Sequence, residues 1–170
     1  MKRWLFLIAL GVGGGLIFRQ IAYEGIYVAT PSMEPTLPVN TNYIVDKLSF
    51  YFRRPKRAEI IVFPSPVDEG KDLIKRVIGI PGDRIRIKDK IVLINGRELK
   101  EPYARHTRGD EILMGDNIPE IKIPEDSYFV MGDNRDESGD SATWKKPGTD
   151  EPLYFIHEGR IKGRLMNVLE

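Results

Sequence analysis

A serine held between two prolines is the first residue of the chain whose type and setting suit covalent chemistry. The segment Thr30–Leu37 reads TPSMEPTL and follows a short apolar cluster. Prolines on both sides restrict the backbone, and a serine nucleophile needs to be held rigidly. The Thr30 hydroxyl and the Ser32 backbone N–H would then converge on a developing oxyanion. The alternative interpretation is an ordinary proline-bounded turn without chemistry.

Lys75 is the candidate base because its neighbours are apolar. The segment Asp72–Asp83 reads DLIKRVIGIPGD, which predicts a strand that ends in a turn. Alternation along the strand places Leu73, Lys75 and Val77 on one face, and aliphatic neighbours disfavour a charged amine. At the reference pKa of about 10.4, only roughly 1 lysine in 2500 is neutral at pH 7, so a lysine base must be desolvated. The alternative is a surface lysine beside Arg76.

A third segment, Met131–Ser141, reads MGDNRDESGDS and is dense in turn formers and hydrogen-bonding side chains. The alternative interpretation of this segment is a calcium-binding loop. An EF-hand loop that began at Asp136 would need glycine at its sixth position and glutamate at its twelfth, where the chain has Ser141 and Pro147. We therefore interpret the segment as a network that orients side chains from other strands, with one hydroxyl reaching a lysine amine.

The rest of the composition disfavours several other chemistries. The chain has no cysteine, which removes disulfides, thiolate zinc sites and a cysteine nucleophile. Its two histidines, His106 and His157, lie in polar stretches without a nucleophile motif, and we interpret both as surface residues. A Ser-His-Asp triad is therefore the weaker option, although a histidine that approaches only in space stays open. A multi-histidine metal site is disfavoured as well, so no metal is expected.

The elements that must position these residues are short strands. From residue 26 onward the apolar residues form short clusters separated by proline and glycine, which is typical of β-structure. Asn95-Gly96 predicts a tight hairpin turn. No helix of convincing length is predicted after residue 25. The predicted strands are 25–30, 43–47, 59–63, 73–80, 84–88, 91–94, 127–131 and 160–165.

The first 23 residues differ in character from the rest. Residues 4–18 form an uncharged apolar stretch, about 22 Å long as a helix, and residues 20–23 would extend it toward the roughly 20 residues that a bilayer span needs. Lys2 and Arg3 favour a cytoplasmic N-terminus. We predict an uncleaved membrane anchor. The alternatives are a cleaved signal peptide, for which no small-x-small site follows the stretch, and a buried core helix, which three consecutive glycines disfavour.

Length and charge limit the remaining possibilities. The chain has 170 residues, of which 41% are hydrophobic and 30% charged, enough for one core-bearing domain with an appendage. Its net charge of +1 provides no overall attraction to nucleic acid, so no nucleic-acid partner is expected. The segment 48–57, LSFYFRRPKR, puts three aromatic residues beside four basic ones and suits contact with anionic lipid. A half-buried edge is the alternative for that segment.

Together these segments resemble the bacterial type I signal peptidases, which are membrane-anchored serine-lysine leader peptidases. The resemblance runs from the N-terminal stretch to about Arg164 and rests on three motifs in order: SMEPTL at 32–37, KRVIG followed by PGD at 75–83, and GDNRD with its trailing ESGDS at 132–141. It implies a mainly β fold, a signal-peptidase-like β-barrel or coiled β-sheet domain with one N-terminal transmembrane helix.

The resemblance also implies how the chain is divided. Residues 1–23 would form a cytoplasmic stub and the transmembrane anchor. Residues 24–170 would form an extracytoplasmic β catalytic domain, with a smaller second β lobe around 84–125. The expected location is the plasma membrane, crossed once, with the N-terminus in the cytoplasm.

The resemblance assigns a role to each residue of the site. Ser32 would be the nucleophile and Lys75 the general base, with the Thr30 hydroxyl and the Ser32 N–H forming the oxyanion hole. Ser138 would hydrogen-bond to the Lys75 amine and orient it, and Asp140 would organise the loop beneath. No metal or organic cofactor is implied. Asp133 and Arg135 would support the site, and shallow apolar substrate pockets would be lined by Val28, Ala29, Met33, Leu73 and Ile74.

The implied reaction is cleavage of N-terminal signal peptides from exported preproteins through an acyl-enzyme. Family members bind substrate as an added strand and select small side chains one and three positions before the cut. Signal peptides and the lipid bilayer are the expected partners, and a monomer is expected. Two alternatives stay open: a catalytically silent anchored β module that binds extended peptides, and a specialised processing peptidase of the same chemistry.

Three features depart from the family pattern. Pro31 stands where a glycine is common, which stiffens the nucleophile loop. Ala142 occupies a position that is often arginine, so part of an ion-pair network would be missing. Residues 145–154 look like an insertion, for which the sequence provides no functional account.

Overall fold

The computed structural model describes residue 13, residues 20–68 and residues 70–166. Within these ranges, none of the helices combines the length and apolarity needed to cross a bilayer. The anchor predicted over residues 1–23 falls mostly on residues outside the described part. Its last residues form a helical turn over 20–22, and the first strand begins directly afterwards at Tyr23.

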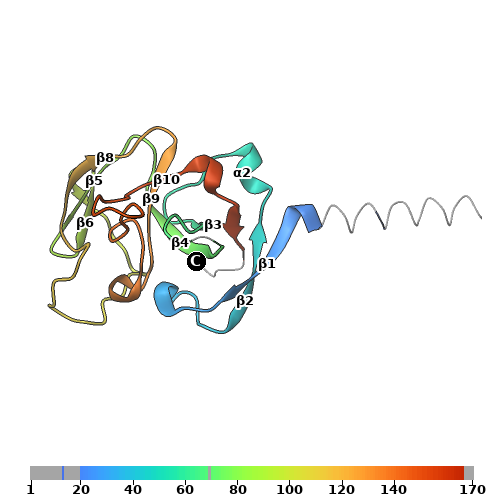
Figure 1. The fold of residues 1–170 in the computed structure, drawn as a ribbon, viewed down its shortest axis with the longest axis horizontal. Helices are drawn as coiled ribbons and strands as arrows, with labels where there is room; N and C mark the ends of the chain where they lie inside the picture. The colour runs from blue at the N-terminus through green and yellow to red at the C-terminus, as the bar shows by residue number, and fades with distance from the viewer. Residues whose placement is uncertain (1–12, 14–19, 69, 167–170) are drawn as a thin grey trace, which may run out of the picture.

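Two antiparallel sheets make up the described part of the chain (Figure 1). The larger sheet has the strand order β1-β2-β11-β3-β4-β9-β10, and the smaller has the order β7-β6-β5-β8. The larger sheet contains β1 (Tyr23–Val28), β2 (Thr41–Asp46), β3 (Ile60–Pro64), β4 (Asp72–Gly79), β9 (Ser127–Met131), β10 (Ile156–His157) and β11 (Gly163–Leu165). The smaller contains β5 (Arg84–Lys88), β6 (Ile91–Ile94), β7 (Arg97–Glu98) and β8 (Ile118–Lys122). The short helices are η1 (Pro31–Met33), α2 (Ser49–Phe52), η2 (Arg135–Glu137) and η3 (Glu158–Arg160).

The prediction of a mainly β fold is confirmed, and β5, β6 and β9 have the predicted bounds. Of the two forms predicted, a β-barrel or a coiled β-sheet domain, the described residues do not form a closed barrel. Closure requires the two edge strands of a sheet to hydrogen-bond to each other. Here β1 pairs with β2, while β10 has only two residues and pairs with β9, so the larger sheet stays open.

The centre of the larger sheet is buried on both faces. Ile60 and Val62 of β3 pack into one apolar cluster, and Ile61 and Phe63 pack into another on the opposite face. This alternation follows from the pleat of a strand. The neighbouring strand β4 is therefore held between two packed layers, which makes it a rigid support for a functional side chain.

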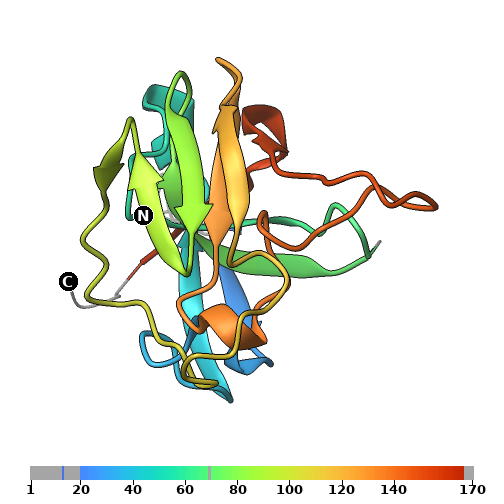
Figure 2. The same ribbon diagram turned by 90° about the vertical axis from the view of Figure 1, so that its left-hand side faces the viewer.

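The smaller sheet packs against the end of the larger one. Figure 2 turns this side toward the viewer. Ile78 of β4 and Phe129 of β9 share a buried cluster with Ile85 and Ile87 of β5. Gly79 allows this close approach, because a Cβ there would lie 2.2 Å from the Ile123 side chain. The two sheets are thus joined by a continuous apolar core.

The segment 145–154 forms an arm that is closed by its own charges. Lys145 pairs with Asp150 at 2.7 Å, and Lys146 pairs with Glu151 at 2.6 Å. The backbone N–H of Lys146 also donates to the Glu151 carbonyl at 2.8 Å. The arm follows Trp144, whose ring packs edge-on against Phe63 in the core.

Candidate active site

Ser32 lies on the 3-10 turn η1, shortly after the end of β1. Thr30 is extended, with φ −129° and ψ 152°, and Pro31 is the first residue of the turn. Proline suits that position because its φ is already close to the helical value and its missing N–H would have no partner there. Ser32 is 8% exposed. The proline that departs from the family pattern therefore fits the turn that it begins.

Two hydrogen-bond donors accompany the Ser32 hydroxyl. The Thr30 Oγ1 lies 3.4 Å from the Ser32 Oγ. The first N–H groups of a helical turn have no acceptor within that turn, which leaves the Ser32 N–H available. Met33 and Leu37 attach the turn to the core. Both side chains are buried in the same apolar cluster, and the Leu37 N–H donates to the Met33 carbonyl at 2.9 Å.

Lys75 lies in the middle of β4, opposite Ile61 of β3, and its side chain is 2% exposed. Burial is the main cause that lowers the pKa of this amine to about 8. The carboxylates of Asp140 and Asp133 act in the opposite direction and raise the pKa, Asp140 more strongly. At pH 7 roughly one Lys75 amine in eleven is then neutral, against roughly one in 2500 for an unperturbed lysine.

The third motif forms a tight loop between the buried Lys75 and the 3-10 turn Pro31–Met33, which carries the candidate nucleophile Ser32 (the nucleophile turn). The Asp140 carboxylate accepts hydrogen bonds from the Gly132 N–H at 2.9 Å and from the Ala142 N–H at 3.0 Å, so it holds both ends of the loop. A Cβ on Gly132 would lie 2.3 Å from the Ser138 Oγ and 2.3 Å from the Ser32 carbonyl oxygen. Only glycine lets these segments approach so closely.

Ser138 does not make the hydrogen bond to Lys75 that the sequence leads us to expect. Its Oγ is buried and has no hydrogen-bond partner among the described residues. The Ser138 hydroxyl lies against the backbone of Gly132 instead. A buried hydroxyl without a partner is uncommon and costs free energy, so this group is available to a new partner.

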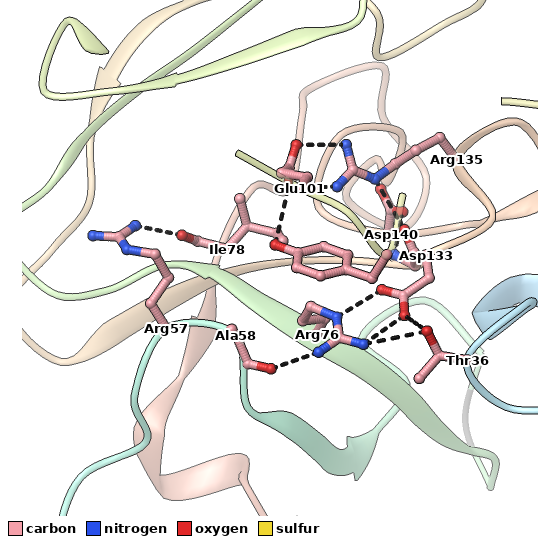
Figure 3. Close-up of polar contacts among 11 residues, drawn as sticks. Thr36, Arg57, Ala58, Arg76, Ile78, Glu101, Asp133, Arg135 and Asp140 are labelled. Carbon is pink, nitrogen blue, oxygen red and sulfur yellow. Dashed lines mark hydrogen bonds and ion pairs between the residues drawn. The ribbon is translucent and has the colours of Figure 1, made fainter. Parts of the chain in front are cut away.

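A buried ion pair joins β4 to the third motif (Figure 3). The Arg76 Nε and Nη2 donate to the two carboxylate oxygens of Asp133 at 2.8 and 2.6 Å, and the Thr36 hydroxyl donates to Asp133 at 2.5 Å. The Arg76 guanidinium also lies 4.0 Å from the centre of the Tyr103 ring and donates to the Ala58 carbonyl at 2.7 Å. Asp133 thus ties the third motif to both the second motif and the nucleophile turn.

The loop that follows β7 braces the third motif from the other side. Arg135 donates to the Glu101 carboxylate at 2.6 and 3.1 Å and to the Gly132 carbonyl at 3.1 Å. The Arg105 N–H donates to the Asp133 carbonyl at 2.7 Å, and the Arg105 carbonyl accepts from the Arg135 N–H at 2.9 Å. Segments from both sheets therefore fix the loop that surrounds Lys75.

Five residues of this arrangement were missed by sequence reasoning. Arg76 lies inside the second motif and Asn134 inside the third. Their positions within these motifs could have marked them as residues of the site. Asn134 hydrogen-bonds to the nucleophile turn through its backbone and its side chain. Thr36 also lies inside the first motif. Glu101 and Tyr103 lie between the predicted strands 91–94 and 127–131, where no local pattern marks them.

The position of Ala142 has a structural counterpart in the loop before β8. A Cβ on Gly115 would lie 2.9 Å from the Ala142 Cβ and 3.1 Å from its carbonyl oxygen. The Gly115 backbone therefore packs closely against Ala142. The Gly115 backbone therefore fills the space beside the small side chain of Ala142.

An open groove of about 500 Å³ runs past Ser32 and Lys75. Its wall comes from the end of β1, the nucleophile turn, the β3–β4 hairpin and the residues after η2. All five residues predicted to form substrate pockets border this groove, and their role in binding stays a prediction. They are Val28, Ala29, Met33, Leu73 and Ile74.

One edge of β4 is open beside the groove. β4 pairs with β3 over residues 72–76, whereas its pairing with β9 begins only at Arg76. Within the described residues, the backbone of 72–75 therefore has no strand on its second side. An edge of this kind can accept an extended peptide as an additional strand.

The two histidines lie away from this groove. His106 Nδ1 is 3.3 Å from the Asp136 carboxylate, and His157 Nε2 is 3.1 Å from the Asp126 carboxylate. Among the described residues, neither histidine borders the groove that contains Ser32 and Lys75. The buried Lys75 amine, in contrast, lines the same groove as Ser32.

Comparison with known proteins identifies the family. The model of the family described as "Signal peptidase, peptidase S26" matches residues 1–169. The chain is 37% identical over 172 residues to signal peptidase I P of Bacillus subtilis subsp. natto, covering 95% of this chain and 92% of the relative. The chain therefore belongs to the signal peptidase family, peptidase S26, and is a hydrolase of that class.

Its relatives within the family are bacterial type I enzymes. The chain is 41% identical over 145 residues to signal peptidase I of Leptolyngbya laminosa, covering 81% of this chain and 68% of the relative. It is 37% identical over 143 residues to "Probable signal peptidase I-2" of Synechocystis sp., of which it spans 60%. The crystal structure of a signal peptidase I from Enterococcus faecalis V583 aligns with a TM-score of 0.49 at 30% identity, covering 66% of this chain and 97% of that one.

Proposed function

We propose that the chain is a serine endopeptidase that removes signal peptides from exported preproteins with a Ser32–Lys75 dyad. The observation that carries this proposal is a buried lysine with its pKa lowered to about 8, on the same groove as a serine that is held in a rigid turn. A nucleophile and a desolvated base on one groove are what acyl transfer requires.

The first step would be attack of the Ser32 Oγ on the scissile carbonyl carbon. The neutral Lys75 amine takes the hydroxyl proton as the new C–O bond forms, and the carbonyl oxygen becomes an oxyanion. The Ser32 N–H and the Thr30 hydroxyl, 3.4 Å from the Ser32 Oγ, are positioned to donate to that oxygen. Preorganised donors of this kind are worth about 3 to 4 kcal/mol each in comparable sites.

The second step would be collapse of the tetrahedral intermediate. The Lys75 ammonium returns its proton to the leaving amine, and the C–N bond breaks to release the mature protein. The leader then stays on Ser32 as an ester. Lys75 is neutral again, so it removes a proton from water while the hydroxyl oxygen attacks the ester and restores Ser32.

The open edge of β4 supports binding of the leader as an added strand. Backbone groups at 72–75 would pair with the substrate, and the shallow apolar wall at Val28, Ala29 and Ile74 would accept small side chains one and three positions before the cut. Residues 4–18 would anchor the enzyme in the bilayer, with its catalytic domain outside the cytoplasm.

The test is cleavage of a preprotein whose leader ends in Ala-x-Ala, in detergent, by the full chain. We expect Ser32→Ala and Lys75→Ala each to lose at least about a thousand-fold in kcat/KM, because each removes a member of the dyad. His106→Ala and His157→Ala are the matched controls and should cut like wild type. Circular dichroism checks the folding of all four variants.

Two outcomes would overturn the assignment. Loss of cleavage in a folded histidine variant, with Lys75→Ala active, would make histidine the base. Binding of leader peptides without cleavage by wild type would favour the silent peptide-binding module.

A further inference from the structure

The groove has two walls, which lie on opposite faces of β4. Leu73 and Ile74 are consecutive in the strand, so their side chains point to opposite faces. Ile74 packs against the apolar cluster that contains Val28, whereas Leu73 packs against the cluster that contains Trp144. All four residues border the groove. A peptide in the groove therefore has one wall on each side.

A leader that was added as a strand along residues 72–75 would alternate its side chains between these walls. The proposed function places the side chains one and three positions before the cut on the wall of Val28 and Ile74. The side chain two positions before the cut must then point to the opposite wall. That wall is the one formed at Leu73 and Trp144.

A glycine leaves space on this second wall. Gly139 borders the groove together with Trp144. For a Cβ built on Gly139, the nearest atom would be the Trp144 Nε1 at 3.7 Å, which is an ordinary van der Waals distance. The φ of Gly139 is outside the left-handed region, so an L-residue could stand there. The open space at Gly139 is therefore available to a substrate side chain.

A carboxylate stands on the same side of the groove, next to the dyad. Glu137 borders the groove and is the last residue of η2, directly before Ser138. Figure 1 and Figure 2 both show η2 beside the nucleophile turn. The Glu137 Oε1 accepts from the Arg108 Nη2 at 2.9 Å, and the side chain remains 44% exposed. Since a carboxylate has several acceptor sites, Glu137 can bind a second cation beside Arg108.

The other two carboxylates that border the groove are placed differently. Asp68 and Asp72 belong to the hairpin between β3 and β4, at the end of the groove away from Ser32. Asp68 pairs with Lys71, and Asp72 pairs with Lys162 at 2.6 Å. Alternation also places Asp72 on the face of Ile74 rather than on the face of Leu73. Among the described residues of the groove, Glu137 is thus the carboxylate on the second wall beside the dyad.

We propose that Leu73, Gly139 and Trp144 contact the side chain two positions before the cut, and that Glu137 makes a basic side chain there preferred over an acidic one. This inference rests on the proposed function and adds a charge preference among the leaders. Glu137 would attract a lysine or arginine side chain of the substrate and repel a glutamate. It is a specificity residue and takes no part in proton transfer.

The test uses three leader peptides that differ only two positions before the cut, where they carry lysine, glutamate or alanine. The full chain in detergent should cleave the lysine peptide with a kcat/KM about fivefold above that of the glutamate peptide at low ionic strength, as expected for an exposed charge pair. The ratio is taken within each protein, so a general loss of activity cancels.

Three charge variants locate the source of this ratio. Glu137→Gln should bring the ratio of lysine to glutamate close to one. Arg108→Gln should raise it above the wild-type value, because Glu137 then no longer shares its charge with an arginine. Asp150→Asn is the matched control, since it removes a carboxylate that also pairs with a basic side chain but does not border the groove. This control should keep the wild-type ratio.

A steric variant tests the wall itself. Gly139→Val fills the space beside Trp144, so it should lower kcat/KM for the lysine peptide several-fold relative to the alanine peptide. Circular dichroism checks that the variant is folded. An unchanged ratio of lysine to alanine in the folded variant would mean that the side chain points elsewhere, and it would overturn the assignment of this wall.

Two further outcomes would contradict the inference. Equal cleavage of the lysine and glutamate peptides by wild type would overturn the charge preference, while cleavage of the alanine peptide in the same experiment would leave the peptidase activity standing. A lysine preference that persisted in Glu137→Gln would overturn the role of Glu137. If wild type cut none of the three peptides, the proposed function would fail, and this inference with it.

Discussion

The backbone N–H of Asn134 donates to the carbonyl oxygen of Ser32 at 3.1 Å, across about a hundred residues of sequence. The side-chain Nδ2 of Asn134 donates to the carbonyl oxygen of Pro31 at 3.2 Å. One residue of the third motif therefore holds two consecutive peptide units of the nucleophile turn. Its side-chain oxygen is buried without a partner among the described residues, a cost that the clamp offsets.

Asn134→Ala should lower kcat by about tenfold while KM changes little. The substitution removes one hydrogen bond of about 1 kcal/mol and lets the nucleophile turn shift, while the substrate groove and the backbone bond to Ser32 remain. Steady-state kinetics with a leader peptide measure this, and the pH dependence should be unchanged because the surroundings of Lys75 are intact. A change confined to KM would assign Asn134 to substrate binding instead.

The pH dependence of cleavage should report the Lys75 amine. The base acts in its neutral form, so kcat/KM should rise with pH up to about 8 and level off above it. Asp140 raises the pKa of Lys75, so Asp140→Asn should move the acidic limb to lower pH in whatever fraction folds. Profiles of kcat/KM over roughly pH 6 to 10 test both points. A limb near the ordinary histidine pKa of about 6.5 would contradict lysine as the base.

Replacing the proposed base should stabilise the fold. The pKa of Lys75 is about 8 in the folded chain and 10.5 in an ordinary lysine, so between these values the unfolded state binds more protons. Stability therefore rises with pH through this window, and the full cost of burying the amine is present below pH 8. That cost is about 3 kcal/mol for a shift of this size. Lys75→Met should thus raise the melting temperature at pH 7, and a fall would mean that the amine makes stabilising contacts.

Removing the Asp133 carboxylate should destabilise the chain strongly. Asp133→Ala leaves the Arg76 guanidinium buried without its partner, and breaking a buried pair in this way costs about 3 to 5 kcal/mol. Asp150→Ala is the matched control, since it removes an exposed ion pair with Lys145 that contributes little. Urea denaturation followed by circular dichroism compares the two. If both variants lost a similarly small free energy of unfolding, the Arg76 guanidinium would be reached by solvent.

Local patterns predicted the parts of the site that depend on a single strand. The alternation of Leu73, Lys75 and Val77 indicated a desolvated lysine, and Lys75 is indeed buried with a lowered pKa. The strands at 84–88 and 91–94 were also readable, because one alternates with period two and the other ends at an Asn-Gly turn.

Long-range polar contacts had no comparable signal. Arg76 and Asp133 are 57 residues apart, and Arg135 and Glu101 are 34 apart, so nothing in either neighbourhood specifies the partner. The strands β7 and β10 have two residues each, too few for a periodic pattern, and β8 contains a proline, which lowers strand propensity. These elements form because neighbouring strands offer them backbone partners: β6 for β7, β5 for β8 and β9 for β10.

The backbone bridge between Arg105 and the third motif bears on protein engineering. A shortened peptidase made by deleting the smaller sheet would lose the two hydrogen bonds that hold Asp133 and Arg135 in place. The deletion would also expose Phe129 and Met131 to water. The arm at 145–152 is a better place to shorten the chain or to insert a foreign sequence, because its charges pair with each other and its ends are already adjacent.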